Sequence, residues 1–168
     1  MATIIEFDGY LPKIGNNCFI AENATIVGHV TIGDNCSIWY GSGLRGDVGE
    51  INIGNNVNVQ DNAVIHCSEG KSTVNIGNNV TIGHNAIVHG ATIKDSVLIG
   101  MGATVLDNTI INENTIIGAN ALVPGNLHLE PNSIYAGIPA KKIKDIPKSS
   151  SIVADSATHY VELKDRYH

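Results

Sequence analysis

The segment from Ile14 to Leu44 reads IGNNCF IAENAT IVGHVT IGDNCS IWYGSG L, with an aliphatic residue at every sixth position. After a jump of nine residues the series resumes at Ile53, and after a jump of eleven it resumes at Ile76. It then shortens by one residue before Ile93 and keeps its period of six as far as Leu129. A period of this kind, in which each unit supplies one short strand and one corner, predicts a parallel β-helix.

Composition agrees with a repetitive β architecture and excludes several classes of protein. The 168 residues include 18 glycines, while charged residues make up only 15% and aromatic residues only 5%. The net charge of −6 comes without a basic stripe, which argues against nucleic acid as a partner. No stretch approaches the ~20 apolar residues that cross a bilayer, and the first ten residues do not resemble a secretory signal.

Three cysteines are an odd number and show no disulfide-like spacing. We therefore expect a reducing compartment, and the cytoplasm is the simplest one.

The repeat resembles the left-handed β-helix of hexapeptide-repeat proteins, over residues from about 10 to 140. The resemblance implies that three hexapeptides form one triangular coil, and each coil rises by about 4.8 Å, the usual strand spacing. The expected fold class is thus all-β, a left-handed parallel β-helix of hexapeptide repeats with a C-terminal α-helix.

Two parts of the chain are expected to differ in structure. Residues 1–140 form the coil, with residues 1–10 as a leading strand that caps its open end. Residues 141–168 form a linker and a helix, because Val153, Ala157, Tyr160 and Val161 share one helical face. This helix is expected along the outside of the coil or against a neighbouring subunit.

The repeat frame assigns positions to the histidines. His66 and His89 each follow the aliphatic residue of their turn, and their turns are three apart, so they occupy equivalent places in adjacent coils. Two nitrogen ligands of a tetrahedral zinc are roughly 3.3 Å apart, a separation that neighbouring coils can provide. His84 falls at another offset on another face, from which it could meet the pair only on a second subunit.

The alternative that these histidines are solvated surface residues stays open at this point. His29, His128, His159 and His168 are interpreted as solvated surface histidines, and the trio could be the same. The breaks in the frame near residues 53, 76 and 93 surround the trio, however, and departures from a repeat often mark functional regions.

Several motifs resemble those of the γ-class carbonic anhydrases. They are LRGD (44–47), NVQDN (58–62), IH (65–66), IGHNAIVHG (82–90) and GIPAK (137–141). The resemblance implies a homotrimer with Zn²⁺, or Fe²⁺ or Co²⁺, bound between subunits by His66 and His89 of one chain and His84 of the next. It implies reversible hydration of carbon dioxide to bicarbonate by a metal-bound hydroxide.

The same resemblance suggests roles for other residues. Gln60 matches the residue that orients the hydroxide, and Arg45 and Asp61 match a pair that links subunits, with Asp47 beside them. Tyr160 matches a tyrosine of the C-terminal helix that lies near the site.

The chain departs from the best-characterised pattern in two places. Val48 stands where that pattern has a glutamate, and the loop after His66 is short, with Glu69 as its one carboxylate. Glu69 is a candidate proton shuttle, although a solvated loop residue is the alternative. Weak hydratase activity is therefore one possible outcome.

Two other functions remain open. The chain could be a hexapeptide acyltransferase or thioesterase acting on coenzyme A thioesters, with Lys141 and Lys142 contacting phosphates. It could also be a non-catalytic trimeric scaffold that binds metal. The absence of a long excursion loop and the presence of three histidines at ligand offsets favour the carbonic anhydrase interpretation.

Overall fold

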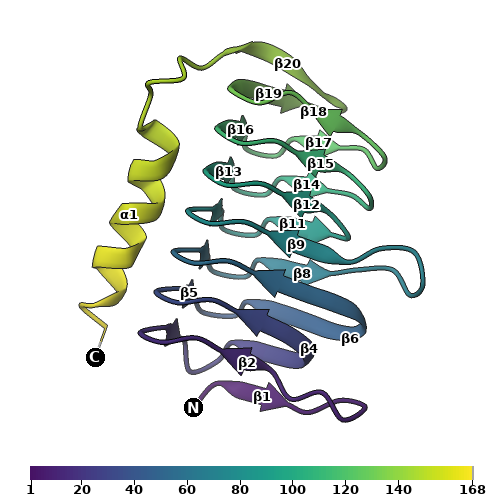
Figure 1. Cartoon of the computed structure of the whole chain (residues 1–168), viewed down its shortest axis with the longest axis vertical. Helices are drawn as coiled ribbons and strands as arrows, with labels where there is room; N and C mark the ends of the chain where they lie inside the picture. The colour runs from purple at the N-terminus through teal and green to yellow at the C-terminus, as the bar shows by residue number, and fades with distance from the viewer. Residues whose placement is uncertain (168) are drawn as a thin grey trace.

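A computed structural model describes residues 1–167 as a coil of short strands with one helix beside it (Figure 1). His168, expected to be a solvated histidine, lies outside the described residues. The elements are β1 (Thr3–Ile5), β2 (Lys13–Ile14), β3 (Phe19–Ile20), β4 (Thr25–Ile32), β5 (Ser37–Ile38), β6 (Gly43–Ile53), β7 (Asn58–Val59), β8 (Val64–His66), β9 (Val74–Ile76), β10 (Thr81–Ile82), β11 (Ile87–His89), β12 (Thr92–Ile93), β13 (Val97–Ile99), β14 (Thr104–Val105), β15 (Ile110–Ile111), β16 (Thr115–Ile117), β17 (Leu122–Val123), β18 (His128–Leu129), β19 (Ser133–Gly137), β20 (Ala140–Asp145) and α1 (Ile152–Lys164).

The strands form three faces, each a stack of parallel strands from successive coils. One face has the order β3-β5-β7-β10-β13-β16-β19. The other two belong to one twelve-stranded sheet, because the long strands β4 and β6 each turn a corner and contribute to both. The predicted parallel β-helix is thereby confirmed.

The six-residue period forms the core. From Ile26 to Leu129 every aliphatic residue of the series is buried, and its neighbours in the strand point outward. Most of the small residues four positions later are buried too, Ala24, Ala63 and Ala86 among them. A small inner residue fits here because three strands converge within one narrow coil.

The corners explain why the chain is rich in asparagine. Asn56 and Asn79 both have a φ of 56°, in the left-handed region that asparagine tolerates better than other residues with a side chain. Asn56 Nδ2 also donates to Asn79 Oδ1 of the next coil, at 3.0 Å. The same asparagine therefore turns the chain and links adjacent coils.

The two ends of the coil are closed differently. β1 adds a parallel strand to β4, as expected of a leading strand, but Ile4 and Ile5 are each 43% exposed. At the other end β20 runs antiparallel to β19, with Ala140 opposite Gly137 and Asp145 opposite Ser133. The segment expected to begin a linker at residue 141 therefore first completes a strand.

Helix α1 runs back along the outside of the coil, so its last turn lies near the end where the chain began (Figure 1). It contacts β5, β7, β10 and β13, and Val153 and Ala157 are buried against them. In residues 1–167 no helix is long and apolar enough to cross a membrane.

Candidate metal centre

His66 and His89 lie at the ends of two stacked strands. β8 and β11 are parallel neighbours in which His66 pairs with His89, and the preceding Ile65 and Val88 are fully buried. Because side chains alternate along a strand, burial of these aliphatic residues turns both imidazoles away from the core. The predicted equivalence of the two positions in adjacent coils is confirmed.

The two rings approach each other through nitrogen atoms. His66 Nδ1 lies 3.3 Å from His89 Nε2, which matches the separation of ~3.3 Å for two nitrogen ligands with bonds of about 2.0–2.1 Å to zinc. On the far sides of the rings, His66 Nε2 is 3.0 Å from Asp47 Oδ1 and His89 Nδ1 is 2.9 Å from Asp107 Oδ2.

The two carboxylates decide which nitrogens are free. Each accepts the N–H of its histidine, so the neutral ring keeps a lone pair on its other nitrogen. Those other nitrogens, His66 Nδ1 and His89 Nε2, are the two that face each other. Facing lone pairs repel unless a cation lies between them, and the donor set therefore fits a metal ion.

Asp47 and Asp107 are suited to hold N–H groups. Burial acts to raise the pKa of Asp47, but hydrogen bonds from His66 and Arg45 outweigh it and hold the pKa below its usual value. The pKa of Asp107 is also lowered, because hydrogen bonds from Ser72 and His89 outweigh its burial. Both carboxylates are therefore ionised at neutral pH.

Asp107 was missed by the sequence reasoning, together with the residues that hold it. It lies 18 residues after His89 and accepts a hydrogen bond from Ser72 Oγ, in the loop after His66. Gly90 makes room for this arrangement, since a Cβ there would lie 2.2 Å from Ser72 Oγ and 2.3 Å from Asp107 Oδ1. Asp107 comes one residue after Leu106, the position one coil beyond His89, and this nearness was the available signal.

His84 occupies the corner after β10 and is oriented by its own carboxylate. Its Nδ1 lies 2.9 Å from Asp61 Oδ2, which leaves Nε2 available as a ligand. Asp61 comes from the coil below, at the matching offset that the repeat frame predicts, since Val59 pairs with Ile82. Among residues 1–167 no group of three His, Cys, Asp or Glu side chains is placed to hold an ion within one chain.

Arg45 and Asp61 have separate partners within the chain. Arg45 Nη1 forms an ion pair with Asp47 Oδ2, and Asp61 holds His84. Arg45 lies one coil below His66, because the residues that precede them, Leu44 and Ile65, are paired between β6 and β8. The expected contact between Arg45 and Asp61 of different subunits remains a prediction.

Gln60 and Tyr160 lie on the side of the molecule that carries His84. Gln60 is buried, and its Nε2 donates to Asn58 Oδ1 at 3.0 Å. With His84 it lines a groove of about 350 Å³ that extends to α1. On α1, the Tyr160 ring packs 5.6 Å from that of Trp39. Burial, and secondarily the charge of Asp61, raises the pKa of Tyr160.

Glu69 lies in the loop between β8 and β9, which projects from the coil in Figure 1. Its exposed side chain borders a pocket that also touches Asp47 and Val48. The candidate shuttle therefore lies near a residue that contacts His66, although the structure brings it to none of the three histidines.

The chain is similar in sequence and in structure to known hexapeptide-repeat proteins. Residues 12–46 and 90–125 match the model described as bacterial transferase hexapeptide (six repeats). A solved structure titled putative acetyltransferase, from Bacillus cereus, is 38% identical and superposes with a TM-score of 0.95, covering 99% of this chain and 96% of that one. The protein is thus a hexapeptide-repeat β-helix.

Two curated relatives define the family. A probable carbonic anhydrase from Methanocaldococcus jannaschii is 47% identical, with 90% of this chain and 96% of the relative aligned. Gamma carbonic anhydrase 2 from Arabidopsis thaliana is 37% identical over 90% of this chain, which spans only 57% of that relative. The chain belongs to the γ-class carbonic anhydrase family.

Proposed function

We propose that this protein catalyses the reversible hydration of carbon dioxide to bicarbonate with a divalent metal held between the subunits of a homotrimer. Zinc is the first candidate for the metal, and Fe²⁺ and Co²⁺ suit the same ligands. The observation that carries the proposal is the 3.3 Å approach of two imidazole nitrogens whose opposite nitrogens are both held by carboxylates.

The ligands in this proposal are His66 Nδ1 and His89 Nε2 of one chain and His84 of the partner subunit. A divalent ion bound by three neutral imidazoles keeps its charge and an open position, and it lowers the pKa of water to about 7. Asp47 and Asp107 fix the rings of the pair through hydrogen bonds of 3.0 and 2.9 Å. The side-chain amide of Gln60, held by Asn58, is proposed to orient the attacking water.

The surface around His66 and His89 has the apolar character expected of a contact with a neighbouring subunit. Val64 and Ile87 stack one above the other in β8 and β11, and they are 44% and 40% exposed. Exposed apolar side chains next to a candidate ligand pair are typical of a face that another chain covers. A trimer would bury them and bring His84 of the partner subunit to the site.

The decisive experiment combines metal analysis, oligomer mass and kinetics. After dialysis the protein should retain about one metal per chain and have the mass of a trimer. Stopped-flow measurement should show metal-dependent hydration of carbon dioxide. His84→Ala should lose both the metal and the rate while its circular dichroism stays unchanged. A wild-type protein that holds metal but shows no metal-dependent rate would rule out the hydratase function.

A mixing experiment tests the position of the site between subunits. His84→Ala chains should be refolded with chains that carry both His66→Ala and His89→Ala. Mixed trimers then contain some interfaces with all three intact histidines and should regain part of the metal. If the mixture never regains metal, the site does not lie between subunits.

An acyltransferase or thioesterase function remains the alternative because the Bacillus cereus structure is titled putative acetyltransferase. Lys142, one of the lysines considered for phosphate binding, is engaged instead by Glu130 and Asp145 at 2.5 and 2.8 Å. Hydrogen bonds to Asp145 and Glu130 also raise its pKa. Binding of acetyl coenzyme A by the metal-free protein, measured by calorimetry, would favour this alternative.

A trimeric scaffold that binds metal without catalysis is the third possibility. It predicts the same metal content and mixing behaviour but no hydration, so the kinetic measurement separates it from the first proposal.

We also propose the cytoplasm as the compartment, because Cys18, Cys36 and Cys67 are all free thiols.

A further inference from the structure

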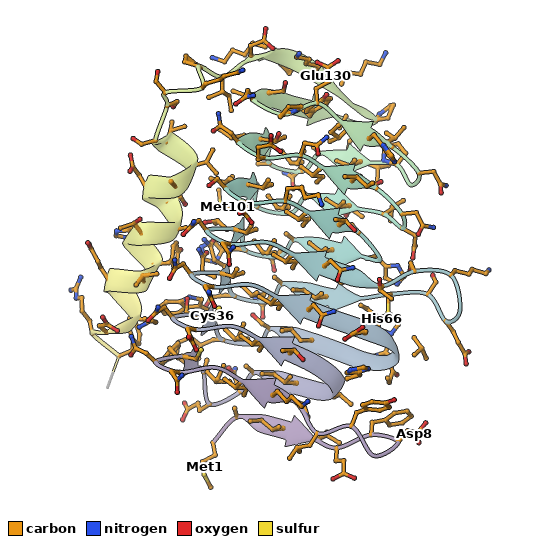
Figure 2. All side chains as sticks on the ribbon, viewed as in Figure 1. Met1, Asp8, Cys36, His66, Met101 and Glu130 are labelled. Atoms are coloured by element: carbon orange, nitrogen blue, oxygen red, sulfur yellow. The ribbon has the colours of Figure 1, made fainter. Side chains whose placement is uncertain are left out.

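A pocket of about 240 Å³ opens beside the candidate metal centre. Asp47 lines it and also contacts His66 Nε2 at 3.0 Å, so the pocket begins one side chain away from a candidate ligand. Asp8 also lines it, and Figure 2 shows Asp8 and His66 along the same edge of the coil. Other lining side chains are Tyr10, His29, Val48, Glu50 and Glu69.

Hydration of carbon dioxide makes a proton that must leave the site. Carbon dioxide and water give bicarbonate and one proton, and the next turnover requires that proton to reach a base in solution. Val48 lies in this pocket, next to Asp47. An aliphatic side chain cannot carry a proton, so another group must do so here.

His29 is the imidazole in this pocket, and its surroundings hold it in place. Its ring stacks on Tyr10 with centroids 4.2 Å apart and an interplanar angle of 14°. Its Nε2 lies 3.4 Å from Glu50 Oε1, and its side chain remains 40% exposed. The ring therefore has a fixed position, a carboxylate beside Nε2 and direct access to solvent.

The register places His29 near the site although it lies far from His66 in sequence. β4 and β6 are parallel neighbours, with Val27 paired with Arg45 and Gly28 paired with Gly46. A Cβ built on Gly46 would lie 2.6 Å from the carbonyl oxygen of His29, so the two backbones touch. His29 thus belongs to the coil directly below Asp47.

We propose that His29, supported by Glu50, receives the proton of hydration and passes it to solvent. This inference rests on the proposed hydratase function. The imidazole accepts one proton to become an imidazolium, the Glu50 carboxylate stabilises that charge, and a buffer base removes the proton. No oxidation or covalent bond is involved, and the ring returns to its neutral form after each cycle.

The other titratable groups of the pocket suit this role less well. Asp47 already accepts hydrogen bonds from Arg45 and His66. Asp8, Glu50 and Glu69 are carboxylates and Tyr10 is a phenol. Histidine is the side chain that most often serves as both general acid and general base, because imidazole accepts and releases protons readily.

The test compares His29→Gln with the wild-type holoenzyme, and His128→Gln serves as a matched control on an exposed histidine of β18. At low buffer concentration His29→Gln should lower kcat by about tenfold or more and leave kcat/KM and metal content unchanged. Added imidazole should restore kcat. Because kcat/KM reports the conversion of carbon dioxide, its preservation separates loss of proton transfer from damage to the site.

A second measurement does not depend on activity. The ¹⁵N chemical shifts of the His29 ring, measured by nuclear magnetic resonance, should differ between the wild type and Glu50→Gln, because the contact of Nε2 with the carboxylate fixes which ring nitrogen carries the proton.

An unchanged kcat in His29→Gln, or a loss that imidazole does not restore, would overturn the inference. So would a buffer-rescued loss in Glu69→Gln in place of His29→Gln. If the wild type itself shows no hydration, the proposed function fails instead, and the two results are distinct.

Discussion

The residues that follow the buried aliphatic residues of stacked strands form one outward column of side chains. This column is polar in the lower part of the coil and apolar in the upper part. In the lower part, the residues that follow the buried Leu44, Ile65 and Val88 are Arg45, His66 and His89. In the upper part, Val105 and Val123 continue the same stack, and the residues that follow them are Leu106 and Pro124. The inner face is equally aliphatic in both parts. The candidate metal ligands therefore differ from the upper part only in the outward positions, and the buried positions are aliphatic throughout.

Substitutions that create a cavity in the core should have the largest effect on the free energy of unfolding. The size of this effect should be the same in both parts of the coil. Ile65→Ala beside the site and Ile117→Ala above it each leave a cavity among fully buried side chains. Each should cost about 2–5 kcal/mol in the free energy of unfolding, measured with urea. Only Ile65→Ala should also weaken metal binding, since Ile65 precedes His66. Equal loss of metal affinity in Ile117→Ala would show that the upper coils contribute to the site.

A carboxylate that holds the histidine pair should affect metal binding more than a carboxylate elsewhere in the coil. Asp107→Asn should reduce metal affinity by about 10–100-fold, because an amide no longer accepts the His89 N–H as strongly. Asp95→Asn is the matched control, since Asp95 accepts a backbone hydrogen bond from Asn78 at a corner away from the site. Competition with a chelator measures both affinities. An equal loss in the two variants would mean that Asp107 supports the fold and has no specific role towards the metal.

Ser72 allows a sharper version of the same comparison. Ser72→Ala removes the hydrogen bond to Asp107 but keeps the carboxylate. Metal affinity should fall by less than in Asp107→Asn, and the ¹⁵N shifts of the His89 ring should change towards a mixture of tautomers. Unchanged ring shifts would show that Asp107 needs no help from the loop.

Corner asparagines should have a moderate effect that is the same in both parts. Asn56→Ala and Asn114→Ala each place alanine at a φ above 50° and remove a hydrogen bond to the next coil. Each should lower the free energy of unfolding by about 1–2 kcal/mol, measured by thermal denaturation. A much larger loss at Asn56 would indicate that the lower coils are less tolerant than the upper ones.

Acid should have the smallest effect, and it should be confined to the surroundings of the histidine pair. The pKa values of Asp47 and Asp107 are lowered in the folded state from 3.8. Their contribution to stability is therefore complete above that pH and is lost as the pH falls through the lower, folded-state values. The metal-free wild type should lose its advantage over Asp107→Asn below about pH 4 in urea titrations. A constant difference at all pH values would contradict this assignment.

Most of the fold could be predicted from the sequence because a coil contacts only its neighbours. The position of Ile65 in its hexapeptide is sufficient to place it in the core, whatever the rest of the chain does. β20 could not be predicted in this way. It is antiparallel and mostly exposed, so neither the hexapeptide period nor an apolar pattern reveals it.

The candidate site could be predicted only where the frame applies. It brought together His66 with His89 and Asp61 with His84, because each pair lies one coil apart. It did not show which ring nitrogens face each other, since hydrogen bonds to side chains decide that. The stacking of His29, interpreted as a solvated histidine, could not be predicted, because its partner Tyr10 precedes the repeat and follows no period.

The stacked coils also govern how the protein comes apart. When each turn is stabilised only by the turns above and below it, unfolding begins as fraying at an end and advances one turn at a time. The turns that contain β8 and β11 lie in the interior of the stack (Figure 1). Hydrogen exchange should therefore be slowest around these strands, and partly frayed molecules should keep the histidine pair in place after their ends have melted.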